Sequence, residues 1–120
     1  SAQQVRISVS GTSKETALGI TLNDNVPTPT PIYTKPIAGL SGIKFTYGIQ
    51  RGPGRSRHAD FWISSDGTTL SFADGFGTEL GNTGIGLTAD ISGGSLRLLY
   101  TSTNLGIAGT MNLQAESLPS

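Results

Sequence analysis

Cysteine is absent from the 120-residue sequence, and histidine, methionine and tryptophan each occur once. Without cysteine there is no disulfide and no thiolate metal ligand, so packing, hydrogen bonds or oligomerisation must hold the fold. A single histidine, His58, is too few ligands for a zinc site. It is also the one available base for a Ser-His-Asp triad, and it lies in a Gly/Pro/Arg loop. The sequence therefore predicts no metal site, no cofactor and no catalytic nucleophile.

Charge is also scarce, because charged residues make up 13% of the chain and eight basic residues balance eight acidic ones. A net charge of zero provides no field to attract nucleic acid or an anionic membrane. No apolar run approaches the roughly 18 residues that cross a bilayer, and the first four residues lack the features of a signal peptide. We expect a soluble chain with no nucleic-acid partner and no membrane insertion.

The carboxylates follow no recognised catalytic or metal-binding pattern. Those that could in principle form a glycosidase pair or a calcium site are Asp60, Asp66, Asp74, Glu79 and Asp90. None of them lies in a loop motif such as D-x-[DN]-x-[DN]-G. Roles in turns and at the solvent-exposed surface explain them, so we expect that the protein is not an enzyme.

Glycine is abundant, at 17 residues, and with serine, threonine and asparagine it separates runs in which apolar and polar residues alternate. Alternation with period 2 is typical of a strand with one buried face. The runs cover residues 5–9, 16–22, 43–49, 59–64, 68–72, 85–91, 96–100 and 107–113. No amphipathic helix is apparent. The sequence predicts one all-β domain over 1–120, an antiparallel sandwich or jelly roll of seven to nine short strands.

Proline marks one long connection. Pro27, Pro29 and Pro31 lack amide donors and disfavour helix, so residues 23–31 are predicted to form an extended loop. A polyproline ligand is an alternative, but a rigid crossover between strands explains the pattern more simply.

Glycine-containing pairs predict the tight turns. Asp66-Gly67 suits a type I′ turn, whose two central residues need positive φ, and Gly93-Gly94 suits a second hairpin. Residues 104–106 are predicted to form a three-residue turn before the closing strand, with Gly106 in the left-handed region. Residues 116–120 are predicted to form a tail.

One local concentration of charge follows the clearest strand. It consists of Arg51, Arg55, Arg57 and His58. Arginine presents a planar fork of donors, so this cluster is a candidate site for a phosphate, a sialic or uronic acid, or carboxylates of a neighbouring subunit. The simpler alternative is a solvated hairpin tip. The glycines beside these arginines precede neither a Gly-Lys-Ser/Thr ending nor a helix, so no nucleotide site is expected.

Two apolar residues are predicted on outer faces. Trp62 lies between Phe61 and Ile63, so in a strand its side chain points away from theirs. Leu99 likewise lies opposite its apolar neighbours in the run 96–100. Trp62 is a candidate for stacking on a sugar, and both residues are candidates for an oligomer interface.

Short motifs in residues 43–112 resemble bacteriophage virion appendage domains, such as those of tail-fibre, head-fibre and related structural proteins. The motifs are Tyr47-Gly48-Ile49-Gln50-Arg51, the run from Ala59 to Thr68, Gly81-Asn82-Thr83-Gly84-Ile85, and the run from Leu96 to Asn104. The resemblance implies a compact β domain at the end of a longer virion protein. It implies a homo-oligomer, with a trimer favoured, that binds a host-surface glycan or other virion proteins. Fibre, spike and capsid-decoration roles all fit.

Two other classes of function remain open. A carbohydrate-binding module would stack a sugar on Trp62 or Tyr47 and contact an acidic substituent through residues 51–58. A polysaccharide hydrolase would need an acid pair such as Asp60 and Asp74. We favour a virion structural or adhesion domain over both.

Overall fold

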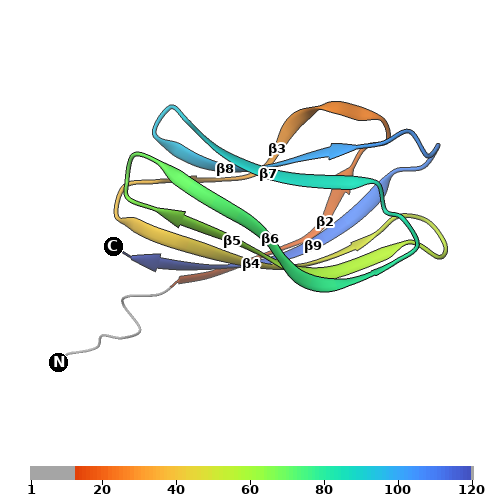
Figure 1. Ribbon diagram of the computed structural model, residues 1–120, viewed down its shortest axis with the longest axis horizontal. Coiled ribbons are helices and arrows are strands. Elements are labelled where there is room, and N and C mark those ends of the chain that lie inside the picture. The colour runs from red at the N-terminus through yellow and green to blue at the C-terminus, as the bar shows by residue number, and fades with distance from the viewer. Residues whose placement is uncertain (1–12, 120) are drawn as a thin grey trace.

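The computed structural model describes residues 13–119, and the strand predicted over residues 5–9 lies outside them. Within residues 13–119 the chain forms eight strands and no helix (Figure 1). The strands are β2 (Ser13–Leu22), β3 (Val26–Pro36), β4 (Leu40–Gln50), β5 (Ser56–Ser65), β6 (Leu70–Leu80), β7 (Ile85–Ser92), β8 (Ser95–Ser102) and β9 (Gly109–Pro119). The prediction of an all-β fold is confirmed. No helix in this part of the chain is long and apolar enough to span a membrane.

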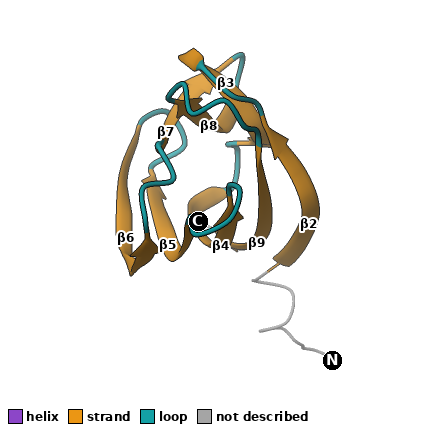
Figure 2. Cartoon of the chain, turned by 90° about the vertical axis from the view of Figure 1, so that its right-hand side faces the viewer, coloured by secondary structure: helices purple, strands orange, loops and turns teal. Residues whose placement is uncertain are grey.

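Every strand pairing is antiparallel, and the strands form two sheets. The larger sheet has the order β2-β9-β4-β5-β6, and the smaller has the order β3-β8-β7. Viewed along the long axis, the smaller sheet lies over the larger one, whose edges curve toward it (Figure 2). This arrangement is the predicted sandwich.

The core lies between the two sheets and uses the alternation seen in the sequence. On β4, Ile43, Phe45, Tyr47 and Ile49 are buried and the residues between them face outward. The other large apolar residues of the core are Leu22, Ile37, Leu40, Phe61, Ile63, Ile85, Leu87, Leu96, Leu98, Tyr100, Met111 and Leu113. Aromatic rings also link neighbouring elements, because the Tyr33 ring meets that of Phe45 edge-on, with centroids 5.1 Å apart.

The prediction of a loop over 23–31 is wrong for most of that range, because β3 begins at Val26. Among the strands of residues 13–119, β3 lies at a sheet edge and pairs with β8 alone, and its register shifts between Val26 and Thr30. Proline is tolerated at a sheet edge and at irregularities, where no ladder hydrogen bond needs its missing amide. The predicted crossover is correct at residues 23–25, where the chain passes from the larger to the smaller sheet.

The alternation predicted for residues 16–22, which would place Leu18, Ile20 and Leu22 on one face, is interrupted. The pairing of β2 with β9 shifts register between Ala17 and Ile20, at a β-bulge. The bulge reverses the alternation, so Leu18 is 73% exposed while Leu22 is buried.

Both predicted hairpins form, but with different turns. Gly93 and Gly94 both have positive φ, of 57° and 78°, and join β7 to β8 by a two-residue turn. The Asp66–Gly67 hairpin instead has a four-residue loop, in which Gly67 has positive φ and Asp66 does not. The Asp66 carboxylate accepts hydrogen bonds from the Thr68 and Thr69 amides, which favours this wider loop over the type I′ turn.

The C-terminal residues differ from the prediction. Gly106 does have positive φ, but the connection spans residues 103–108 and crosses between sheets instead of closing a hairpin. Residues 116–119 are not a tail, because β9 continues through them in the larger sheet. β9 lies between β2 and β4, so it has a partner on both sides as far as Ser117, and β4 continues to pair with it through Pro119.

The molecule is elongated, with principal extents of 53, 26 and 22 Å. Ser13 at the start of β2 pairs with Ser117 near the end of β9, so the described chain begins and ends at the same end of the sandwich (Figure 1). The connections 23–25, 51–55, 81–84 and 103–108 gather at the opposite end, on the right of Figure 1. We call this the loop end.

Candidate functional site

The four residues of the predicted basic cluster do not form one site. Arg51 is buried in the loop end, Arg55 is half-buried in the β4–β5 loop, and Arg57 lies on the inner face of β5. His58 lies on the opposite, outer face of β5 and is exposed. Arg57 and His58 lie on different faces because successive side chains in a strand point to opposite sides of the sheet.

Arg51 connects the loops of the loop end. Its side chain is 0% exposed. Its Nε donates to the Ile107 carbonyl at 2.9 Å, and its Nη1 donates to the Thr83 carbonyl at 2.8 Å. Its Nη2 donates to the Asp24 carboxylate and to the Thr103 carbonyl. Arg51 therefore holds three loops together and cannot contact a receptor, contrary to the role predicted for it.

Asp24 completes this buried connection. The carboxylate that pairs with Arg51 also accepts hydrogen bonds from the amides of Leu105 at 2.8 Å and Gly106 at 3.2 Å. The hydrogen bond from Leu105 is the largest cause that holds the pKa of Asp24 below its ordinary value of 3.8. The loop end is therefore held by an ionised carboxylate and a guanidinium whose polar atoms meet specific backbone groups.

A shallow polar cavity of about 640 Å³, wide open to solvent, lies beside this connection, and we call it the loop-end cavity. Arg57 and Glu79 line it, with the Arg57 Nη1 3.5 Å from the Glu79 Oε2. The Arg57 Nη2 donates to the Ile85 carbonyl at 2.9 Å, and the guanidinium carbon lies 5.7 Å from the centre of the Tyr47 ring. The guanidinium is thus fixed in place and paired with one carboxylate.

Glu79 is held by Thr83 as well as by Arg57. The Thr83 hydroxyl donates to Oε2 of Glu79 at 2.6 Å, and the Thr83 amide donates to the same oxygen at 3.3 Å. The hydroxyl contributes most to lowering the pKa of Glu79 from its ordinary value of 4.5. Glu79 is therefore an ionised acceptor with a fixed orientation at neutral pH.

The remaining polar wall of the loop-end cavity is uncharged. It is made of Asn25, Asn82, Thr101, Ser102, Thr103 and Asn104, which come from three different connections and β8. Gly84 leaves room here, because a methyl group on its Cα would lie 2.1 Å from the Thr103 hydroxyl. Gly84 also has a φ of 64°, so any other residue would be strained as well as obstructed.

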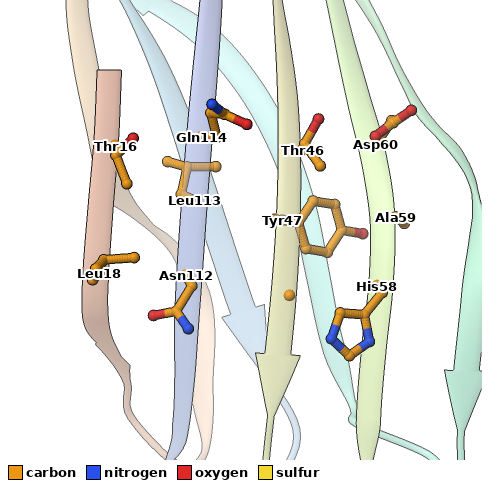
Figure 3. A pocket seen from close by; sticks show the side chains of 11 residues that line it. Thr16, Leu18, Thr46, Tyr47, His58, Ala59, Asp60, Asn112, Leu113 and Gln114 are labelled. Carbon is orange, nitrogen blue, oxygen red and sulfur yellow. The ribbon is translucent and has the colours of Figure 1, made fainter. Parts of the chain in front are cut away.

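A second depression, of about 670 Å³, lies on the outer face of the larger sheet (Figure 3). Its side chains come from four strands and include Thr16, Leu18, Thr46, His58, Asp60, Asn112 and Gln114. The His58 imidazole lies over Gly48, where a methyl group would be 3.0 Å from the ring. We call this surface the outer sheet face.

Trp62 lies on the same outer face, as the alternation predicted. It is 49% exposed, while Phe61 and Ile63 on either side of it are buried. The indole lies over Gly75, and the Lys44 ammonium is 5.1 Å from the ring centre. Leu99, by contrast, is only 3% exposed, so in this structure it has almost no surface to offer another subunit.

The sequence does not single out the residues that build the loop-end cavity. It predicts turn or surface roles for Glu79, an extended loop at Asn25 and a turn at Asn104, and it gives no role to Asn82 beyond a motif. A usable signal was present, because each asparagine adjoins a glycine-rich or proline-rich connection between strong strands. Within residues 13–119, no group of three or more His, Cys, Asp or Glu residues could hold a metal ion.

Comparison with solved structures finds a similar fold within a phage tailspike protein. No protein-family model matches the chain, and no curated protein matches it in sequence. The crystal structure of the Acinetobacter baumannii phage AM24 tailspike protein matches 91% of this chain with a TM-score of 0.54 and 11% identity. The tailspike protein gp49 of Acinetobacter baumannii bacteriophage Fri1, named as a capsular polysaccharide depolymerase, matches 90% with a TM-score of 0.37 and 17% identity.

The chain spans a small part of these proteins, 26% of the AM24 tailspike and 17% of the Fri1 tailspike. At 11% identity the first match concerns the fold alone, and the second is too distant to support an argument. The fold of this chain is therefore similar to that of a segment of a phage tailspike.

Proposed function

We propose that this chain is a structural domain of a phage virion appendage and that it contributes adhesion to the host surface. The main support is a fold similar to part of a tailspike over 91% of the chain. The motifs of residues 43–112 point independently to the same class of protein. Because fold similarity alone does not determine function, the virion location and the adhesive role need their own test.

The shape of the domain supports an adhesive role. The described chain begins and ends at one end of a sandwich that is 53 Å long, and four connections gather at the other. A domain attached through its termini would present the loop end outward. Loops held on a rigid β scaffold are common binding surfaces.

We also propose that the domain acts by binding and not by catalysis. Asp60 lies on the outer sheet face, whereas Asp74 accepts a hydrogen bond from the Tyr47 hydroxyl at 2.9 Å. The two carboxylates named for a hydrolase therefore belong to different environments. Glu79 is paired with Arg57 and Thr83, which keeps it ionised and unsuited to donating a proton.

Immunogold electron microscopy on virions of the phage that encodes this sequence tests the location. Antibodies raised against the chain should label the tail, with pre-adsorption to the purified chain as the control. Label on the capsid would assign a decoration role in place of the tail. Virions that carry no label, although the antibodies recognise them after denaturation on a blot, would contradict a surface-exposed appendage domain.

We propose that the domain acts as a homotrimer, in keeping with the resemblance to appendage domains. Cyclic oligomers bury matching surfaces, and the exposed apolar side chains of Leu18, Phe72, Leu80 and Leu118 are candidates for such contacts. Light scattering at micromolar concentration should give three times the 12.4 kDa mass of the chain. A monomer across the whole concentration range would remove this proposal and leave the adhesive role in place.

A free-standing carbohydrate-binding module is the second candidate, favoured by the exposed indole of Trp62. In that case the sugar would stack on Trp62 at the outer sheet face, and Asp60 nearby on β5 would accept its hydroxyl protons. Glycan binding that is lost on Trp62→Ala but kept on Leu80→Ala would support this candidate. Leu80 is a suitable control because its side chain is also exposed and lies on a different strand.

A further inference from the structure

We propose that the loop-end cavity binds an uncharged saccharide and that Glu79 and Arg57 together bind two neighbouring hydroxyl groups. This inference rests on the proposed adhesive function and assigns its ligand site. It replaces the predicted acidic ligand, because Arg51 is buried and Arg57 is already paired with Glu79.

Glu79 has an acceptor to spare. Its Oε2 receives the hydrogen bonds from Thr83 and Arg57, whereas Oε1 receives none from the described residues. The side chain is 35% exposed and lines the cavity. An ionised carboxylate oxygen that is fixed through its partner oxygen is a strong acceptor for a hydroxyl proton.

Arg57 has donors to spare beside that acceptor. A guanidinium carries five N–H groups, and that of Arg57 donates to Glu79, to the Ile85 carbonyl and to the Tyr47 hydroxyl, which leaves further donors. Its Nε is buried without a partner, so any free donors open to a ligand are on the terminal nitrogens. One hydroxyl can donate to Glu79 while its neighbour accepts from Arg57, which is the pattern of a vicinal diol.

The rest of the cavity suits the same chemistry. Asparagine amides both donate and accept, as sugar hydroxyls do. The Asn82 oxygen accepts from the Gly84 amide at 2.9 Å, which orients the Asn82 amide nitrogen. Asn25 and Asn104 are exposed in the lining, and Val26, Pro27 and Ile85 supply apolar wall for the C–H face of a ring.

Charge argues for an uncharged ligand. The single positive group in the lining, Arg57, is matched by the single negative group, Glu79, and the free Glu79 oxygen would repel a carboxylate or phosphate. The cavity is also preorganised, because Arg51 and Asp24 hold the loops that form it. Little ordering of the protein is then needed on binding, which favours affinity.

Two variants test the site. Glu79→Gln keeps the shape of the side chain and removes its charge. Asn25→Gly removes an amide but keeps the left-handed backbone, since Asn25 has a φ of 56°. The probe is an array of bacterial surface polysaccharides that contains neutral chains and chains rich in uronic or sialic acid. We expect the intact chain to bind neutral members and to lose binding when their vicinal diols are cleaved by periodate.

Each variant should raise the Kd for the best neutral polysaccharide about tenfold, as expected for a lost hydrogen bond to a charged or well-oriented group. Trp62→Ala, on the outer sheet face, is the matched control and should leave that Kd unchanged. Circular dichroism and unfolding midpoints of all three variants check that the fold is kept.

Three results would overturn the inference. The first is no binding to any neutral polysaccharide, and the second is a preference for acidic polysaccharides. The third is binding that is lost in Trp62→Ala but retained in Glu79→Gln and Asn25→Gly. If Glu79→Gln fails to fold, the Kd of Asn25→Gly for the neutral polysaccharide alone tests the site. Labelling of the phage tail is measured separately, so the proposed function can stand when this site fails. Virions without label would contradict the proposed function whatever the array shows.

Discussion

Arg51 uses all three guanidinium nitrogens on acceptors from three separate loops. A buried guanidinium is costly unless its donors are satisfied, and here backbone carbonyls and the Asp24 carboxylate satisfy them. The residue that the sequence offered as a ligand contact is therefore an internal support for the loops. Its neighbour Arg55, whose side chain is half-buried, provides a natural comparison.

Replacing Arg51 by methionine should lower the free energy of unfolding by about 3–5 kcal/mol, since Asp24 and several buried carbonyls lose their partner. The equivalent change at Arg55 should cost less than about 1 kcal/mol, because that side chain is partly solvated. Urea unfolding followed by tryptophan fluorescence measures both. Equal losses at the two positions would mean that Arg51 does not connect the loops.

Phe61 and Trp62 are adjacent but face opposite sides of β5, and their contributions to stability should differ accordingly. Phe61→Ala leaves a cavity in the core and should cost about 3–5 kcal/mol. Trp62→Ala removes a half-exposed ring and should cost less than about 1 kcal/mol. Thermal unfolding followed by far-UV circular dichroism compares the two variants. A larger loss for Trp62→Ala would place that ring in a buried interface.

At the scale of elements, hairpin turns and bulges decide how each strand meets its neighbours. The Gly93–Gly94 turn has positive φ at both residues and joins β7 and β8 without extra residues. The β2 bulge, by contrast, adds a residue that changes which side chains of the strand point toward the core, and it leaves Leu18 exposed. Local backbone conformation therefore selects which apolar residues enter the core.

Two substitutions at Gly93 test this dependence. Gly93→Asn should leave stability nearly unchanged, because asparagine tolerates the left-handed region at the first position of a type I′ turn. Gly93→Val should cost about 1–2 kcal/mol, since a β-branched residue is strained at a φ of 57°. Chemical unfolding midpoints measure the difference. Similar midpoints for the two variants would show that the turn does not need its left-handed conformation.

At the scale of the whole molecule, stability should depend on pH through its paired carboxylates. Asp24 and Glu79 have pKa values lowered from 3.8 and 4.5 by hydrogen bonds that exist only in the folded chain. A lowered pKa contributes stability that is present above the ordinary value and lost as pH falls through the folded-state value. Melting temperature should therefore hold at neutral pH and fall below about pH 4.

The Asp24→Asn variant should have a lower melting temperature than the parent at pH 7. Between pH 5 and pH 3 its melting temperature should fall by less than that of the parent. A variant as acid-sensitive as the parent would exclude Asp24 as a cause. Burial raises the pKa values of Tyr33 and Tyr47 above 10.0, so stability should also fall as the pH rises above that value.

Local sequence patterns are enough to predict the class of fold and the buried faces of several strands. Alternation is a local property of the backbone, so the buried face of β4 and the outward Trp62 could be predicted without knowing any partner strand. Glycine pairs likewise located the hairpins, although the Asp66 carboxylate selected a wider loop than the pair alone indicated.

The sheet to which each strand belongs, and the residues that meet at the loop end, depend on contacts between distant parts of the chain. β8 and β9 are consecutive, yet they lie in different sheets, and β9 is inserted between β2 and β4. This order brings Asp24, Thr83 and Thr103 onto Arg51, and it brings Asn25, Asn82 and Asn104 around Glu79. Residues so far apart in sequence meet through long-range strand pairing, which short-range periodicity does not encode.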